Sequence, residues 1–480
     1  MKKVTFISAL LFFVLQGCTS SREKSILKND ILSDCNKAIQ NAIVVDHISA
    51  PVGARRYYYA SVAAYEALVP FYPSQKSLAG QLHALKALPT VDTAKGYCLD
   101  LVALAAHTYV SKIVVYKEDS INSFRSRMLS WYKSQLPSST FANSVSWGDS
   151  VGAHIAKWSK SDSFGYYRGR DFYLAKNANG FWQPTPSEYK QAVEPMWGHI
   201  RTAAVPLKPN QGSSVYGIAY DADKFGSIKT IKVPKTICLL PDSIAKNQGL
   251  HSPWMHYSLA EPFSSNKNSR FYALCKEVYD VVNRKDSNEL RIAKYWDDNP
   301  NTTVHYGHAT INILKVSPAG HWLGMFSIVA QQKKYSLIES AEGMAILSSA
   351  IHDAFVSCWK VKYETEYVRP VTSIRQLIDS SWTPPIETPG FPEYPSGHSV
   401  VSSAAATVLT HFFGEYEFTD SSEKEFGLGT RTFKNFRAAS NEACASRLYG
   451  GIHFIDAIEK GKILGNAVGD WIVGHLVTKR

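Results

Sequence analysis

Residues 336–363 read SLIESAEGMAILSSAIHDAFVSCWKVKY, and this stretch decides the class of fold. Its apolar residues recur every three or four positions, which is the spacing of one face of an α-helix. The face formed in this way carries Leu347, Ile351, Phe355, Cys358, Trp359 and Lys362. Because the apolar stripe ends in a lysine, the sequence predicts a long core helix with an ammonium group at the edge of the core.

The same periodicity appears on both sides of this helix. It predicts further helices over residues 55–69, 94–116, 120–131, 143–158, 270–282, 399–413 and 456–477. Glycine, proline and aromatic residues dominate between residue 166 and about residue 241, which predicts a long irregular insert. Strand-like alternation is scarce. We therefore expect an all-α fold of helical bundles with long irregular loops, divided into an N-terminal helical region over residues 33–330 and a C-terminal helical domain over residues 331–480.

The composition permits a large hydrophobic core and argues against several classes of function. The chain has 480 residues, of which 45% are hydrophobic, and its net charge of +11 is spread along the sequence. Without a basic block or a nucleic-acid motif, this charge predicts no nucleic-acid partner. The seven cysteines include no C-x-x-C pair, so neither a zinc site nor a redox motif is predicted from them. The oligomeric state and any disulfide pairing stay open.

The N-terminal segment predicts export from the cytoplasm. Two lysines precede an apolar run over residues 4–15, which is shorter than the roughly 20 residues that a membrane-spanning helix needs. The run ends in Leu15-Gln16-Gly17-Cys18, which resembles a bacterial lipobox. We therefore expect a signal peptide over residues 1–17, a lipid on Cys18 and a tether over residues 18–32.

A lipid on Cys18 would be the only membrane attachment of an exported lipoprotein on the periplasmic side or at the cell surface. The alternative is an ordinary cleaved signal that happens to end near a cysteine.

The end of the long helix supplies two cations for a possible anion site. Arg369 follows Lys362 by seven residues, which is about two helical turns. Pro370 disfavours helical geometry at the residue before it, so the helix should end there and return Arg369 toward the lysine. Taken alone, the pair could equally be a lysine with its stem on the core and a surface arginine.

The segment Pro395-Ser396-Gly397-His398 predicts the start of a helix that faces a ligand. Several prolines precede it and an Ala/Ser/Val-rich helix follows it. The start of a helix presents free backbone N–H groups and the positive end of the helix dipole. Glycine lets the backbone approach a ligand closely, and histidine exchanges protons near neutral pH. The alternative is an N-cap followed by a surface histidine.

The segment Ser446-Arg447 with His453 completes the set. The planar fork of an arginine can bind two oxygens of an oxyanion, and the Gly450-Gly451 bend before His453 can turn an imidazole inward. A structural role is the alternative for each residue alone. Together the three segments provide three cations, a hydroxyl, a backbone donor and two imidazoles, which suit a tetrahedral oxyanion such as phosphate or vanadate.

The combined pattern K-x6-RP, PSGH and SR-x5-H resembles the signature of the PAP2 phosphatase and vanadium haloperoxidase superfamily over about residues 340–475. The segment Trp296-Asp297-Asp298-Asn299-Pro300 and the segment Gly320-His321-Trp322 also resemble bacterial vanadium haloperoxidase-type proteins. The resemblance implies an all-α fold of two bundles and makes residues 331–480 the catalytic domain.

The resemblance also implies a role for each signature residue. The oxyanion would be held by Lys362, Arg369, Ser396, Gly397 and Arg447. His453 would bind the central atom, as the metal ligand if that atom is vanadium, and His398 would act as general acid and base on the opposite side. The cofactor would be vanadate, with phosphate as a substrate or competing ligand.

Carboxylates near the two imidazoles are expected to orient them. Phosphatase-type members usually place an aspartate four residues after the second histidine, whereas here Asp456 stands three residues after His453. On a helix both spacings bring side chains together, so Asp456 is included as a catalytic residue. By resemblance, Asp297 or Asp298 would orient His398. The remaining histidines near the motifs are expected to be structural, and they are His308, His321 and His352.

The same site serves two reactions, and the sequence favours one of them. A haloperoxidase would use peroxide to oxidise a halide or an organic acceptor at a histidine-bound vanadate. An acid phosphatase would hydrolyse a phosphomonoester through a phosphohistidine. Trp359 and Phe391 match aromatic positions of chloroperoxidase-type relatives, and the chain lacks membrane spans, so the haloperoxidase is preferred. A third possibility, a non-catalytic phosphate-binding lipoprotein, would leave both imidazoles without a purpose.

Overall fold

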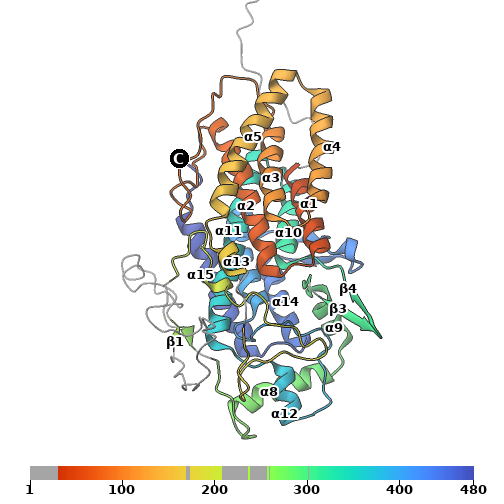
Figure 1. Cartoon of the computed structure of the whole chain (residues 1–480). Helices are drawn as coiled ribbons and strands as arrows, with labels where there is room; N and C mark the ends of the chain where they lie inside the picture. Colours follow the sequence, from red (N-terminus) through yellow and green to blue (C-terminus); the bar gives the residue numbers. More distant parts are fainter. Residues whose placement is uncertain (1–30, 169–172, 208–235, 238–256, 259, 301) are drawn as a thin grey trace, which may run out of the picture.

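Helices make up nearly all of the regular structure in the computed structural model (Figure 1). The structure describes the chain except for residues 1–30, 169–172, 208–235, 238–256, 259 and 301. The predicted signal peptide, Cys18 and most of the predicted tether therefore lie outside the described residues. The prediction of an all-α fold is confirmed, and the strands of the described part form only small two-stranded antiparallel sheets.

Five helices form an N-terminal bundle, which stands in the upper part of Figure 1. They are α1 (Ile31–Asp46), α2 (Ala50–Leu68), α3 (Leu99–Val114), α4 (Asp119–Gln135) and α5 (Ser138–Ser159). Helix α2 packs on both α3 and α5 and is buried over almost its whole length. Because an all-round buried helix must lie at the centre of a core, α2 is the axis of this bundle.

A second bundle contains the helices that carry the motifs. It consists of α10 (Pro318–Gln332), α11 (Leu337–Thr365), α13 (Gly397–Phe413), α14 (Phe436–Tyr449) and α15 (Ile455–His475). Helix α11 packs on α2 as well as on α13 and α15, so one hydrophobic core continues through both bundles. The proposed domain boundary near residue 331 stays a prediction.

Short elements cover the lower end of the molecule in Figure 1. The helices there are α8 (Arg270–Asn283), α9 (Ser287–Tyr295) and α12 (Pro370–Leu377), whereas α6 (Phe164–Arg168) contacts Arg55 of α2. The 3-10 turns are η1 (Val69–Phe71), η2 (Trp197–His199) and η3 (Lys424–Phe426). The paired strands are β1 (Thr236–Ile237) with β2 (Tyr257–Ser258), β3 (Thr303–Tyr306) with β4 (Ala309–Asn312), and β5 (Phe418–Asp420) with β6 (Arg431–Phe433).

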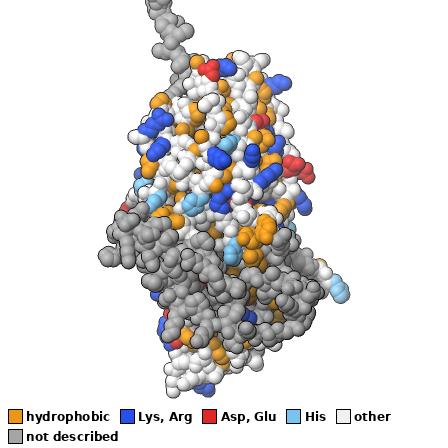
Figure 2. Space-filling model, turned by 60° about the vertical axis from the view of Figure 1, so that its left-hand side comes forward, with side chains coloured by type: hydrophobic (Ala, Val, Ile, Leu, Met, Phe, Trp, Pro, Cys, Tyr) orange, Lys and Arg blue, Asp and Glu red, His pale blue; other side chains and the backbone are white. Residues whose placement is uncertain are grey.

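Each predicted helix is present, with ends shifted by a few residues, and the described part of the irregular insert contains only α6, η2 and β1. The sequence analysis missed α1, α9, α10, α12 and α14. None of the described helices is long and apolar enough to span a bilayer. The basic side chains on the face in Figure 2 are scattered among its described residues, in agreement with the spread charge of the sequence.

Three glycines bring α15 unusually close to α13. A Cβ on Gly461 would lie 2.7 Å from Cβ of Ser399, and a Cβ on Gly469 would lie 2.6 Å from Cβ of Thr407. Gly465, between them, faces the backbone of Val400 in the same way. Heavy atoms cannot approach so closely, so only glycine permits this helix contact. The contact fixes the start of α13, where the PSGH motif lies, against the start of α15.

Candidate active site

The C-terminal end of α11 positions the lysine of the site. Lys362 is fully buried, and its Nζ donates to the carbonyl oxygens of Pro392 at 2.7 Å and Glu393 at 2.8 Å. The helix ends at Thr365, because Glu366 adopts a left-handed conformation with φ of 47°. These bonds fasten the proline-rich loop before the PSGH motif to the end of α11.

Arg369 is the N-cap of α12, with Pro370 in the first turn. Its backbone is extended, so the prediction that the helix ends before this arginine is confirmed. Nε donates to the carbonyl of Phe391 and Nη1 to that of Ile452, both at 2.9 Å. Nη2 is buried and has no hydrogen-bond partner in the described structure. One corner of this guanidinium is therefore available to a ligand.

The PSGH motif forms the N-terminus of α13, as predicted. Ser396 is the N-cap, and its Oγ accepts hydrogen bonds from the N–H and the hydroxyl of Ser399 at 3.3 and 2.9 Å. A Cβ on Gly397 would lie 3.6 Å from Trp359 and 3.9 Å from Lys362, which are ordinary contacts. Since the neighbours would tolerate a side chain, the bare backbone at Gly397 is best explained by a ligand over the start of the helix.

Arg447 lies in the last turn of α14 and is fully buried. Its Nη2 donates to the carbonyl of Trp296 at 2.6 Å, and its Nε to the hydroxyl of Ser446 at 2.9 Å. The same carbonyl of Trp296 accepts a hydrogen bond from the ring of His398. Nε2 of His398 is buried without a partner, so this imidazole also keeps one polar atom for a ligand.

His453 projects from the bend between α14 and α15 and lies beside Arg369. Its Nε2 is 3.2 Å from Nη1 of Arg369, and its Nδ1 is 2.8 Å from Oε1 of Glu393. The same carboxylate oxygen accepts the backbone N–H of Phe454 at 2.9 Å. Glu393 therefore orients the imidazole and directs Nε2 toward the space between the cations.

The structure pairs Asp456 with Arg270 and not with His453, so its catalytic role stays a prediction. Asp456 lies at the start of α15 and pairs with Nη2 of Arg270 at 2.6 Å, on the surface. Its place beside His453 is taken by Glu393, which the sequence analysis missed. The signal for Glu393 was an acidic residue between Pro392 and Tyr394, directly before the PSGH motif.

The carboxylates predicted to orient His398 are also engaged elsewhere. Asp297 pairs with Lys315, and Oδ2 of Asp298 lies 2.9 Å from Nδ1 of His321. The ring of His398 is oriented by a backbone carbonyl in their place.

The histidines predicted to be structural fit that description in part. Nε2 of His352 lies 3.0 Å from the carbonyl oxygen of Arg201, and its ring stacks on Tyr58 with centroids 4.7 Å apart. His308 is exposed in the turn between β3 and β4. His321 is buried among carboxylates, a setting with consequences described below.

A cavity opens beside these groups, with His398 and His453 in its wall. Its aromatic lining includes Phe355, Trp359 and Phe391, which confirms the predicted aromatic wall. The rings of Trp359 and Phe391 have centroids 4.8 Å apart. The Phe391 ring also lies 5.1 Å from Nζ of Lys362, a distance typical of a cation–π contact.

The electrostatics of the site are those of a buried cluster of cations. Burial lowers the pKa of Lys362 to about 7 and that of Arg369 to about 10. Burial, followed by the charges of Arg369, Lys362 and Arg447, holds the pKa of His453 well below its usual value. A buried oxyanion would reverse each of these shifts, because it favours the charged form of its neighbours. The residues present therefore fit vanadate or phosphate.

The fold and the site define a helical-bundle protein with buried cations and two imidazoles suited to a tetrahedral oxyanion. Residues 342–479 match a family model described as the VCPO second helical-bundle domain. The structure is similar to the crystal structure of the first bacterial vanadium-dependent iodoperoxidase, with 33% sequence identity and a TM-score of 0.76. The match covers 94% of this chain and 96% of that chain. The chain belongs to the vanadium haloperoxidase family.

More distant structures share the fold. The holo and apo forms of a bacterial vanadium-dependent chloroperoxidase match with TM-scores of 0.61 and 0.59, each at 16% identity. Both matches cover 89% of this chain, and they cover 92% and 95% of the respective other chains. None of the functionally curated proteins compared with the sequence matches it significantly. Members of this family are peroxidases, so the chain is an enzyme, and the alternative of a non-catalytic binding protein is not supported.

Proposed function

We propose that this enzyme oxidises a halide with hydrogen peroxide at a vanadate ion bound to His453. The observation that carries the proposal is a pair of buried ligand-facing atoms, Nε2 of His398 and Nη2 of Arg369, that have no protein partner. Buried polar atoms are normally hydrogen-bonded, so a donor of Arg369 that has no partner among the described residues, with Lys362 and Arg447 close by, favours an anionic ligand. The aromatic wall of the cavity favours vanadate chemistry over phosphate-ester binding.

The residues that would hold vanadate are those of the three motifs: Lys362, Arg369, Ser396, Gly397, Arg447 and His453. When bound, vanadate supplies a Lewis-acidic centre at which peroxide becomes reactive toward a nucleophilic halide. The cations offset the charge of the anion, and the helix N-terminus provides oriented donors that need no reorganisation during the reaction. Because its pKa is depressed, His453 is neutral, and Nε2, which faces Arg369 while Nδ1 faces Glu393, is the ring nitrogen that would serve as a ligand.

His398 is placed to move a proton on the side facing the cavity. The carbonyl of Trp296 holds its ring, so that the unpartnered Nε2 can accept a proton from an incoming peroxide. Burial, followed by the charge of Arg447, holds the pKa of His398 well below its usual value, so the imidazole is neutral before peroxide arrives. Trp359 and Phe391 limit water at this site and provide polarizable surface for a large halide. We expect iodide to be the halide, as the name of the similar iodoperoxidase suggests.

A second candidate, an acid phosphatase, is favoured by Glu393. A carboxylate that accepts the N–H of Nδ1 leaves Nε2 without a proton and raises its basicity. A nucleophilic histidine needs both properties. In that reaction His453 would attack the phosphorus of a phosphomonoester, and His398 would protonate the leaving alcohol.

The test compares both reactions on one preparation without the signal segment. We expect orthovanadate to confer peroxide-dependent oxidation of iodide, followed by bromide, and His453→Ala to abolish it. The matched control is Asp280→Asn, which breaks an exposed pair with Lys276. Hydrolysis of p-nitrophenyl phosphate by the vanadate-free protein, with no peroxide-dependent halide oxidation, would favour the phosphatase and contradict the proposal.

We also propose that the enzyme is an exported lipoprotein attached through Cys18. The support is the lipobox-like sequence alone. Expression of the full chain and of Cys18→Ala, followed by membrane fractionation, tests it. We expect membrane association of the first and release of the second, whereas equal partitioning of the two would contradict the anchor.

A further inference from the structure

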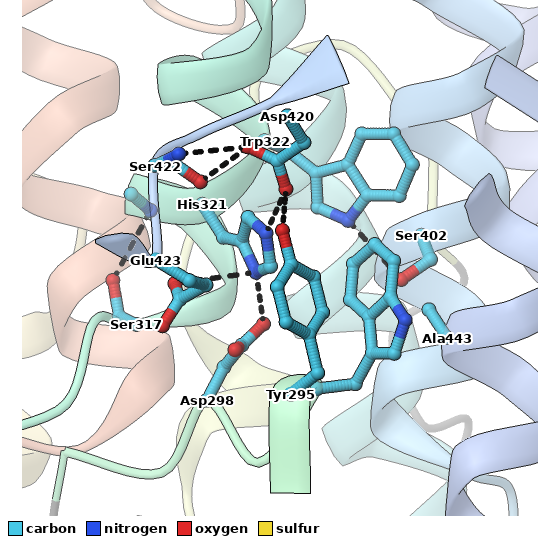
Figure 3. Close-up of polar contacts among 12 residues, drawn as sticks. Tyr295, Asp298, Ser317, His321, Trp322, Ser402, Asp420, Ser422, Glu423 and Ala443 are labelled. Carbon is cyan, nitrogen blue, oxygen red and sulfur yellow. Dashed lines mark hydrogen bonds and ion pairs between the residues drawn. The ribbon is translucent and has the colours of Figure 1, made fainter. Parts of the chain in front are cut away.

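Figure 3 shows a second cluster of titratable side chains, and it adjoins the active-site cavity through Asp298. Asp298 comes from the loop after α9, His321 from the first turn of α10, and Asp420 and Glu423 from the end of β5 and the turn after it. All four are buried, with at most 3% of any of them exposed. The proposed oxidation of halide uses none of them.

The hydrogen bonds of the cluster are unevenly distributed. Nε2 of His321 lies 2.8 Å from Oδ2 of Asp420, which also accepts the hydroxyl of Tyr295 at 2.6 Å. The other oxygen of Asp420 accepts the N–H and the hydroxyl of Ser422 at 2.9 and 2.7 Å. Asp420 is therefore fully satisfied. By contrast, Oε1 of Glu423 is buried without a hydrogen-bond partner and lies 3.6 Å from Nδ1 of His321.

The charges of the cluster do not balance. Three carboxylates surround one imidazole, so an excess of negative charge remains even when both nitrogens of His321 carry protons. The nearby ammonium of Lys315 is paired with Asp297, and the charge of Arg447 is shared between Asp297 and Asp298, so these two cations do not balance all the carboxylates when those are ionised. Buried carboxylates are costly unless a cation offsets them, and a divalent ion supplies the missing charge.

We propose that Asp298, His321 and Glu423 bind a divalent transition-metal ion of the Zn²⁺ type. One oxygen from each carboxylate and one imidazole nitrogen lie within 4.8 Å of one another. A tetrahedral ion with bonds of about 2.0–2.1 Å separates its ligand atoms by roughly 3.3 Å. The observed separations from Nδ1 of His321, 2.9 Å to Asp298 and 3.6 Å to Glu423, lie on either side of that value.

The remaining contacts of His321 fit a metal ligand. A histidine that binds a metal through one nitrogen commonly donates the other N–H to a carboxylate, and Asp420 occupies that position. On binding, the ion replaces the proton on Nδ1, which leaves to solvent, while the N–H to Asp420 is kept. The ring also stacks on Trp296 with centroids 4.7 Å apart, which fixes its plane. A mixed nitrogen and oxygen set favours Zn²⁺ or Mn²⁺ over Ca²⁺.

The ion would have a structural role for the active site. The loop that carries Asp298 also carries the carbonyl of Trp296, which holds Arg447 and His398. Asp298 itself lines the cavity. A metal ion would therefore tie this loop to α10 and to the turn after β5, directly behind the oxyanion site.

The test is a Zn²⁺ titration of the chelator-treated enzyme by calorimetry, without vanadate, peroxide or halide, so that it does not depend on the proposed oxidation. We expect one Zn²⁺ per chain. Glu423→Gln, which keeps the shape of the side chain, should weaken binding by at least about 100-fold. Asp420→Asn, which removes only the partner of the ligand, should weaken it by about 10- to 100-fold.

Asp298→Asn serves as a second ligand variant, and melting curves check that each variant folds. The matched control is Asp280→Asn, an exposed carboxylate far from the cluster, which should bind Zn²⁺ as the parent does. Absence of stoichiometric Zn²⁺ uptake by the parent enzyme would overturn the proposal. Parent-like affinity in both Glu423→Gln and Asp298→Asn would also overturn it, since the ion would then bind elsewhere.

Discussion

Two buried histidines in the C-terminal bundle have surroundings of opposite charge. His453 meets three cations and one carboxylate, and its pKa is held well below the usual value by burial and by those cations. His321 meets three carboxylates, and although burial lowers its pKa, Asp298 and Asp420 outweigh burial and raise it well above the usual value. The same side chain at the same depth thus belongs to an anion site in one place and to a cation site in the other.

Burial alone therefore does not set the protonation state of a histidine in this protein. Both rings are nearly inaccessible, so the difference comes from the charges supplied by neighbouring elements. The five predictions below test the two surroundings, from the largest expected effect to the smallest.

Removal of the imidazole at the anion site should have the largest effect. His453→Ala deletes the atom that would bind vanadate, so we expect peroxide-dependent halide oxidation to fall by at least about 10³-fold. Binding of vanadate, measured by calorimetry, should be lost in parallel. Retention of vanadate binding with parent affinity would show that the cations alone define the anion site.

Weakening the cation set should have the next largest effect. Arg369→Lys keeps the charge but removes the planar fork and the free Nη2, so we expect turnover to fall by about 100-fold. Steady-state kinetics on vanadate-loaded protein measures this loss. Recovery of most activity by the lysine would mean that charge matters at this position and geometry does not.

Neutralising the carboxylate on His453 should have an intermediate effect. Glu393→Gln removes the charge that orients Nδ1, so we expect vanadate affinity to fall by about 10- to 100-fold. Titration with vanadate measures the change. An unchanged affinity would indicate that the second bond to this side chain, from the N–H of Phe454, is enough to hold the loop.

The pH dependence of stability should reflect the buried neutral histidines. Burial lowers the pKa of His352 to about 4 and that of His107 to about 3, against an ordinary value near 6.5. Below pH 6.5 these two histidines take up protons in the unfolded chain but stay neutral in the folded chain. The free energy of unfolding therefore falls as the pH falls. Between pH 6.5 and 5, His352 alone should cost about 2 kcal/mol.

Thermal melting of the parent protein and of His352→Gln across this range checks the sign. His321 should act in the opposite direction, because its pKa is raised in the folded chain. Its contribution to stability is fully present below pH 6.5 and is lost as the pH rises through the pKa that it has in the folded chain. If His352→Gln lost stability in acid as steeply as the parent protein, the lowered pKa of His352 would be contradicted.

Removal of the charge of Asp456 should have the smallest effect on turnover and stability. Asp456→Asn breaks only a pair with Arg270, and both side chains are substantially exposed. We expect turnover within about twofold of the parent and a change in stability below about 1 kcal/mol. A large loss of turnover would support the catalytic role that the sequence suggested for Asp456.

Short-range sequence signals made part of the fold and of the site predictable. Pro370 marked the helix boundary at Arg369, and Ser396 marked the start of α13, because both signals act within a few residues. Gly397, His398 and His453 line one cavity, as the resemblance implied for the motif residues. Helix α14 escaped prediction because its buried face consists of small residues such as Ala439, Ser440 and Ala443, which give a weak hydrophobic pattern.

The missed carboxylate has a different cause. Glu393 reaches His453 from 60 positions away in the chain, so no local pattern could have paired them. Asp456 was predicted from helical spacing, but α15 begins only at Ile455, and its first turn directs this side chain toward Arg270. Long-range contacts of this kind depend on how the loop and helix ends pack, which periodicity does not encode.

The glycines of α15 have a consequence for how this enzyme can diverge. Through Gly461, Gly465 and Gly469, α15 meets α13 at the main chain, and the N–H of Ser396 donates to the carbonyl of Ala457 at 3.0 Å. Backbone contacts therefore set the distance between two parts of the site. One is the loop that carries His453, and the other is the start of the helix that carries His398. Core side chains elsewhere could be exchanged over evolutionary time with the two imidazoles keeping their separation, as long as these three positions stay without a side chain.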